Sequence, residues 1–160
     1  MDEIDVLVET KVNPTEDLEK VKRAVENIFG DMKFDVVPER RGGLLVAKAQ
    51  GIGVLAELRE MLRRERIRAA ARRVFLEKLT EKSLTFYLNK QVAYVSHISF
   101  SKPVGESPLG PIKVQIRCDN PQKLIEWLAP RTLKPKRKRA RAYASGKGMS
   151  NLIKSSATFT

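Results

Sequence analysis

The chain has 160 residues, and its 31 Lys and Arg against 19 Asp and Glu give a formal net charge of +12. With one cysteine, Cys118, and one histidine, His97, it can hold neither a disulfide framework nor a Cys/His zinc site. No apolar stretch approaches the length of a membrane span, and the acidic N-terminus is unlike a signal peptide. We therefore expect a soluble, cytoplasmic protein.

The N-terminal part of the chain predicts a strand followed by a helix. Residues 3–12 alternate apolar and polar side chains, which is typical of a strand with one buried face. Apolar side chains then recur at helical spacing over Leu18–Phe29, and Gly30 ends this helix. Either Asn13 or Thr15 can cap the helix, because the acids that follow suit its first turn.

A hairpin and a broken helix come next. Residues 33–37 and 44–49 are typical of two strands, and the Gly-Gly pair between them supplies the positive φ that the turn needs. Residues 54–79 have helical spacing, but their two apolar stripes lie more than a quarter turn apart. We therefore expect a break near Arg64–Arg66 that divides this segment into two helices.

The rest of the chain predicts three more strands and a last helix. The expected strands are residues 84–89, 93–100 and 112–117. Asp119 or Asn120 caps the helix, which ends near Leu128. This order of elements predicts an α+β fold in which helices pack on one face of a mainly antiparallel sheet.

Four short motifs carry a resemblance to a known family. They are Asn13–Asp17 (NPTED), Leu88–Tyr94 (LNKQVAY), Ser107–Ile112 (SPLGPI) and Trp127–Thr132 (WLAPRT). With these motifs in this order, residues 3–132 resemble a family of small archaeal proteins that are grouped as RNA-binding-like. The resemblance implies an archaeal protein whose fold is similar to that of a ribosomal protein that binds 5S RNA. It implies no catalytic or ligand-binding residue.

The positive charge is concentrated at the C-terminus. All 19 acids lie between Asp2 and Glu126, whereas residues 130–160 contain nine bases and no acid. We therefore divide the chain into an RNA-binding-like domain, residues 1–130, and a basic, flexible tail, residues 131–160. The tail bases that we expect to meet phosphates are Lys136, Arg137, Lys138, Arg139 and Arg141. The alternative is a tail that only keeps the protein soluble.

A second group of candidate phosphate contacts lies on the predicted pair of helices. These candidates are Arg59, Arg63, Arg64, Arg68 and Arg72. Several are four residues apart, and such like-charged neighbours on a helix are unfavourable without an anion. The guanidinium fork also suits two phosphate oxygens at once. The alternative is a solvated helical surface on which Glu57, Glu60 and Glu65 pair with the arginines.

Lys90 is a third candidate, in a turn expected between two strands. With Asn89 and Gln91 beside it, it can contact a phosphate or a base edge, although such residues often serve only the turn. We expect a structural role for His97, within a strand, and a buried position for Cys118. No nucleophile motif or carboxylate cage stands out, so we expect neither an enzyme nor a cofactor or metal site.

The sequence therefore favours a non-enzymatic RNA-binding protein that reads backbone and shape, with RNA as its partner and no membrane contact. The first alternative is a protein-interaction module, such as a homodimer formed through an exposed strand or a helical face. A small-molecule enzyme is the third hypothesis, and it requires a deep pocket with converging polar groups.

Overall fold

The computed structural model describes residues 3–103 and 109–131 of the chain. Within these residues, five strands form one sheet whose neighbouring strands are all antiparallel, in the order β2-β3-β1-β5-β4. The strands are β1 (Ile4–Val12), β2 (Lys33–Pro38), β3 (Gly43–Gln50), β4 (Ser83–Asn89) and β5 (Pro111–Cys118). The predicted α+β class with a mainly antiparallel sheet is confirmed.

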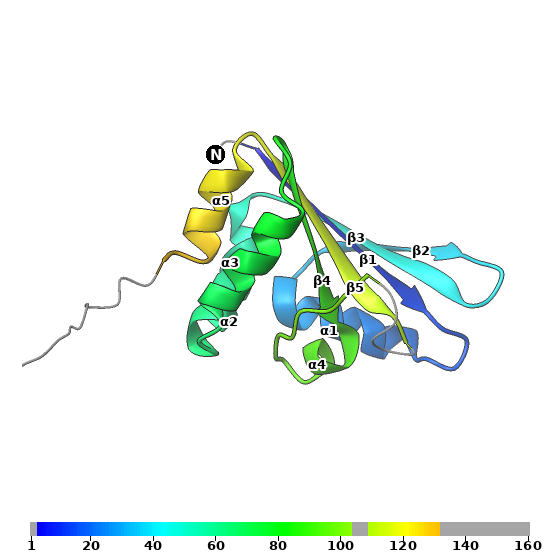
Figure 1. The fold of residues 1–160 in the computed structure, drawn as a ribbon. Helices are drawn as coiled ribbons and strands as arrows, with labels where there is room; N and C mark the ends of the chain where they lie inside the picture. Colours follow the sequence, from blue (N-terminus) through cyan, green and yellow to red (C-terminus); the bar gives the residue numbers. More distant parts are fainter. Residues whose placement is uncertain (1–2, 104–108, 132–160) are drawn as a thin grey trace, which may run out of the picture.

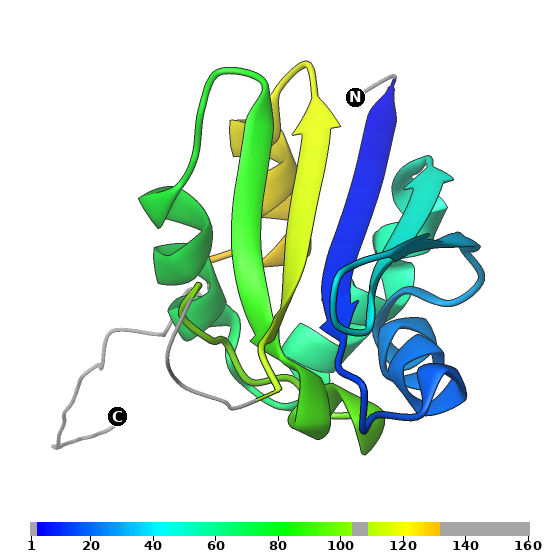
Figure 2. The same cartoon turned by 90° about the vertical axis from the view of Figure 1, so that its right-hand side faces the viewer.

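The helices lie on one face of this sheet (Figure 1). They are α1 (Leu18–Phe29), the short 3-10 helix η1 (Ile52–Leu55), α2 (Ala56–Arg64), α3 (Arg68–Glu77), α4 (Lys90–Tyr94) and α5 (Pro121–Leu128). Their apolar side chains and those of the sheet form one buried core. Figure 2 shows the opposite face of the sheet, which none of these helices covers.

The alternation of side chains in β1 explains why the sheet has two different faces. Val6 and Val8 are at most 2 % exposed, whereas the intervening side chains, such as Asp5, are more accessible. The neighbouring strands continue the apolar row, because Val8 lies opposite Ala47 of β3 and Val114 of β5. Burial of each valine contributes roughly 2 kcal/mol, which fixes the register of the sheet.

Helix α1 begins at a different cap from the one expected. Asp17 caps it, because its carboxylate accepts a hydrogen bond of 3.0 Å from the backbone N–H two residues later. The prediction of a cap at Asn13 or Thr15 is wrong, since Asn13 bonds to Glu16 instead. Gly30 ends the helix as predicted, with a left-handed φ of 72°.

The predicted break between two helices is confirmed. Helix α2 ends at Arg64 and α3 begins at Arg68, and Arg66 between them has a left-handed φ of 59°. The backbone N–H of Ile67 donates to the carbonyl of Leu62 at 3.1 Å, which closes the turn. The two helices are therefore consecutive and joined by a turn rich in arginine.

The strand predicted at residues 93–100 is wrong. Asn89 caps helix α4 there, because its side chain accepts a hydrogen bond of 2.9 Å from the backbone N–H of Val92. After α4 the chain has no regular strand up to residue 103, and Phe100 forms only an isolated bridge with Leu88. Helix α4 thus takes up the chain to Tyr94, and the left-handed φ of 65° at Ser96 interrupts the extended conformation that the predicted strand needs.

Candidate nucleic-acid interface

Five arginines of α2, α3 and the turn between them make up the first candidate surface. These α2–α3 arginines are Arg63, Arg64, Arg66, Arg68 and Arg73. Arg63 bonds to Glu60 at 2.6 Å and Arg64 to Glu57 at 3.4 Å, yet both arginine side chains are more than half exposed. The hydrogen bond from Arg63 lowers the pKa of Glu60.

The other α2–α3 arginines have no such partner. Within residues 3–103 and 109–131, Arg66, Arg68 and Arg73 make no ion pair. Arg68 also lies in the first turn of α3, where the helix dipole disfavours a cation. These guanidinium groups therefore contribute little to the helices, and they remain available to an external anion.

Two of the predicted RNA contacts hold α5 in place instead. The Nε of Arg59 donates to the carbonyl of Trp127 at 2.9 Å, and its guanidinium lies 5.0 Å from the centre of the indole ring. Arg72 donates to the carbonyl of Ala129 at 3.0 Å and to the carboxylate of Glu126 at 2.8 Å. Both arginines therefore bind the WLAPRT motif to α2 and α3.

This attachment also places the start of the basic C-terminal segment. The chain reaches Arg131 two residues after Ala129, which Arg72 holds beside α3. The predicted tail contacts lie outside the described residues: Lys136, Arg137, Lys138, Arg139 and Arg141. The described chain thus ends at Arg131, just after α5, which packs on α2 and α3.

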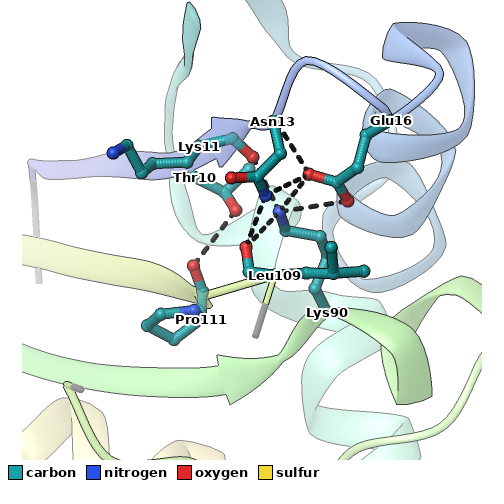
Figure 3. A network of polar contacts seen from close by, with 7 residues as sticks. All are labelled: Thr10, Lys11, Asn13, Glu16, Lys90, Leu109 and Pro111. Carbon is teal, nitrogen blue, oxygen red and sulfur yellow. Dashed lines mark hydrogen bonds and ion pairs between the residues drawn. The ribbon is translucent and has the colours of Figure 1, made fainter. Parts of the chain in front are cut away.

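The structure places Lys90 inside the protein and not on an exposed turn. Its side chain is only 4 % exposed, and Figure 3 shows its ammonium group surrounded by oxygens. Nζ donates to the carbonyls of Lys11 at 2.7 Å and Leu109 at 2.9 Å, and to Glu16 at 3.0 Å. The expectation of a turn between two strands is wrong, because Lys90 begins helix α4, and its ammonium group bonds to three acceptors within the fold.

Glu16 completes this buried network. Burial alone would raise the pKa of its carboxyl group, but hydrogen bonds from Asn13 and Lys90 outweigh burial and lower the pKa. Burial lowers the pKa of Lys90, and the bond to Glu16 opposes that shift. The side chain of Asn13 also donates to the carbonyl of Leu109 at 3.0 Å. Residues of the NPTED, LNKQVAY and SPLGPI motifs therefore share one buried network of hydrogen bonds around Lys90.

A second candidate surface, which the sequence patterns do not reveal, is the uncovered face of the sheet. Five bases lie at the strand positions that alternate with the buried residues: Lys11, Lys33, Lys48, Lys113 and Arg117. In the described part of the chain none of them forms an ion pair. In the sequence, these bases occupy the polar positions that alternate with apolar ones in each strand. They form a group only when the strands are aligned in the sheet.

Cys118 and His97 are the two residues for which we expected no role in binding. Cys118 is buried, as predicted. His97 does not lie in a strand; it follows α4 on the surface, with Nδ1 at 3.2 Å from Glu65. No group of three or more His, Cys, Asp and Glu among the described residues is placed to hold a metal ion. Over the same residues, no helix combines the length and apolarity needed to cross a membrane.

Comparisons with known proteins place this fold among archaeal relatives. A family model described as RNA binding matches residues 5–118. A UPF0201 protein of Sulfurisphaera tokodaii is 42% identical over 132 residues, which are 81% of this chain and 89% of that protein. A UPF0201 protein of Thermococcus onnurineus is 40% identical over 128 residues, 80% of this chain and 93% of the relative.

Solved structures show the same architecture. A UPF0201 protein from Methanococcus jannaschii is similar with a TM-score of 0.72 and 37% identity, over 80% of this chain and 94% of the other. A DUF54 protein from Archaeglobus fulgidus has a TM-score of 0.56 and 23% identity, over 77% of this chain and 93% of that one. The second likeness concerns the fold alone.

Proposed function

Because the chain belongs to the UPF0201 family of archaeal proteins and a family model described as RNA binding matches its residues 5–118, we propose that it is a non-enzymatic, cytoplasmic RNA-binding protein. Its α2–α3 arginines and its C-terminal bases contact the phosphate backbone. The likeness of the fold to a ribosomal protein that binds 5S RNA is part of this proposal.

One observation supports the proposal more than any other. Arg59 and Arg72 hold the end of α5 against α2 and α3, the helices that carry the α2–α3 arginines, and the basic segment begins two residues after Ala129. We infer that the C-terminal bases, which follow Arg131 in the sequence, act together with the α2–α3 arginines. A polyanion that reaches one group is close to the other, which favours a long phosphate backbone over a single small anion.

The chemistry of this surface favours recognition of backbone and shape. Arginine forks bind pairs of phosphate oxygens, and each phosphate neutralised releases a counterion. Neither the α2–α3 arginines nor the basic segment adds a set of stacking aromatics, such as sequence-reading RNA modules use. We therefore expect a preference for structured RNA and little discrimination between sequences.

The test is a filter-binding titration on structured RNA, duplex DNA and single strands at several salt concentrations. The protein is used whole, without residues 133–160, and as the variant Arg64→Gln/Arg68→Gln. Both changes should weaken binding to structured RNA, and the arginine variant should lower the salt slope by about two, because it neutralises two fewer phosphates. The matched control is Lys20→Gln/Lys123→Gln, which removes two exposed bases elsewhere. Binding that the arginine variant retains in full would contradict the proposed surface.

A second candidate function, homodimer formation, rests on the free edge of the sheet. Val36 and Val37 of the edge strand β2 are 44% and 48% exposed. At the other edge the backbone of β4 already bonds to Ser99 and Ser101, at 2.8 and 2.9 Å. Strand β2 is thus the edge on which a second copy can add its own β2. Light scattering tests this, since Val37→Lys should convert any dimer to monomer.

A further inference from the structure

A hollow of about 880 Å³ lies at the β2 edge of the sheet, where β3 extends past the start of β2. Leu7 of β1, Met32 before β2 and Val54 of η1 supply apolar side chains to it. Lys33, Lys48 and Arg117 line the same hollow. No residue of α2 or α3, the helices that carry the α2–α3 arginines and pack on one face of the sheet (Figures 1 and 2), lines this hollow.

The two lysines of the hollow are held side by side by the register of the sheet. Lys33 of β2 lies directly opposite Lys48 of β3, and such antiparallel partners have Cβ atoms about 5 Å apart. Two like charges in this position destabilise a strand pair unless an anion lies between them. No carboxylate among the described residues forms an ion pair with either lysine.

In the other charged cross-strand pairs of the uncovered face of the sheet, an acid lies opposite a base. Asp5 lies opposite Arg117, and Glu9 lies opposite Lys113, so each of these pairs has one acid and one base. Asp5 also accepts a hydrogen bond of 3.0 Å from the side-chain amide of Gln50. The lysine pair is therefore the position on this face where the fold brings two like charges into register.

The remaining groups of the hollow fit more than a bare anion. Its apolar side chains offer a surface for a flat, weakly polar ring, and the carboxylates of Asp5 and Asp31 can accept hydrogen bonds from hydroxyl groups. A phosphate, a sugar with free hydroxyls and a base together make a nucleotide. Carboxylates bind ribose hydroxyls in other nucleotide sites.

We propose that this hollow binds a single ribonucleotide, with the phosphate between Lys33 and Lys48 and the base on the apolar side chains around Leu7. The nucleotide is either free or one unit of a single-stranded RNA, since both offer the same phosphate, ribose and base. The proposal goes beyond the α2–α3 surface and does not depend on it.

Equilibrium dialysis of the full chain tests the site with the four ribonucleoside 5′-monophosphates, their nucleosides, inorganic phosphate and a short single-stranded oligoribonucleotide. The variant Lys33→Gln/Lys48→Gln should weaken nucleotide binding at least about tenfold. The control Lys20→Gln/Lys123→Gln removes the same charge from exposed positions and should have no such effect. Nucleosides and inorganic phosphate should each bind more weakly than the nucleotide.

The arms of this experiment separate the outcomes. Lysine-dependent binding of monophosphates identifies a free nucleotide, and lysine-dependent binding of the oligonucleotide alone identifies a unit of RNA; both support the site. If Lys33→Gln/Lys48→Gln binds nucleotides with unchanged affinity, the proposed site is wrong. The same holds if inorganic phosphate binds as tightly as any nucleotide. Arg64→Gln/Arg68→Gln, tested in parallel, should keep this binding, so failure of the α2–α3 surface and failure of the hollow are distinguishable.

Discussion

At the scale of single residues, the buried side chain of Lys90 connects three segments that are distant in the sequence. Its three acceptors belong to β1, to the turn before α1 and to the segment before β5. The substitution Lys90→Met keeps the length of the side chain but leaves the Glu16 carboxylate, 11% exposed, without its cation. Loss of one partner of a buried pair is costly.

We therefore expect Lys90→Met to lower the free energy of unfolding by about 3 kcal/mol. Urea unfolding followed by circular dichroism measures this. Lys20→Met on the exposed side of α1 is the control and should have little effect. The double variant Glu16→Leu/Lys90→Met should recover part of the loss, since no buried charge remains, and a double variant as unstable as the sum of both single changes would contradict this account.

Glu16 also makes the stability of the fold depend on pH. Its pKa in the folded protein lies below the ordinary value of 4.5, so the folded state takes up its proton later than the unfolded state as the pH falls. The stabilisation is complete above the unfolded pKa and disappears as the pH drops through the folded pKa. We expect the stability difference between the natural protein and Glu16→Gln to shrink in acid, below about pH 4.5. A difference that stays constant down to about pH 2 would show that Glu16 is not the group that titrates.

The sequence alone did not reveal this network of hydrogen bonds around Lys90. Asn13, Glu16 and Lys90 are polar residues of apparent turns, and nothing in local spacing distinguishes a turn lysine on the surface from one that is buried. Their roles depend on Leu109, 19 positions after Lys90 in the sequence. Local patterns report the period of an element, whereas an ion pair between distant turns needs the tertiary fold.

At the scale of elements, the docking of α5 depends on Arg59 and can be followed directly. Trp127 is the only tryptophan, and the Arg59 guanidinium stacks on it while bonding to its carbonyl. Arg59→Gln should shift the fluorescence of Trp127 to longer wavelength and destabilise the protein by about 1 kcal/mol.

Arg63→Gln is the matched control for this change, because Arg63 lies on the same helix, is more than half exposed and bonds to Glu60. It should leave both the emission of Trp127 and the unfolding midpoint unchanged. Equal spectra for the two variants would mean that Arg59 does not hold α5.

The elements themselves were largely predictable, and the exceptions have physical causes. The phase shift between apolar stripes predicted the break near Arg64–Arg66, because helical period is a strong local signal. Residues 93–100 were predicted to form a strand because Val95, Ile98 and Phe100 favour strands. The cap at Asn89 and the burial of Lys90 and Ala93 instead favour the helical turn α4, which extends to Tyr94. Short elements are decided by such tertiary contacts more than by propensity.

At the scale of the whole molecule, the distribution of charge was readable from the sequence, but its arrangement was not. Arg59, Arg63, Arg64, Arg68 and Arg72 look equivalent along the chain. In the fold, Arg59 and Arg72 bind α5 while Arg63, Arg64 and Arg68 remain accessible to different degrees. The lysines of the uncovered face of the sheet could not be recognised as a group in the sequence, since they belong to four strands.

The basic C-terminal segment should contribute to binding and not to folding. Removal of residues 133–160 takes away eight bases and no acid, which lowers the net charge from +12 to +4. The contacts that hold α5 lie within the remaining residues, from Arg59 and Arg72 to Trp127 and Ala129. We expect the shortened protein to keep its Trp127 emission and to unfold within about 0.5 kcal/mol of the full chain. Its affinity for RNA should become less dependent on salt, because fewer phosphates are neutralised. A large loss of stability on removal of the segment would mean that it packs on the domain, and the division of the chain near residue 130 would then be wrong.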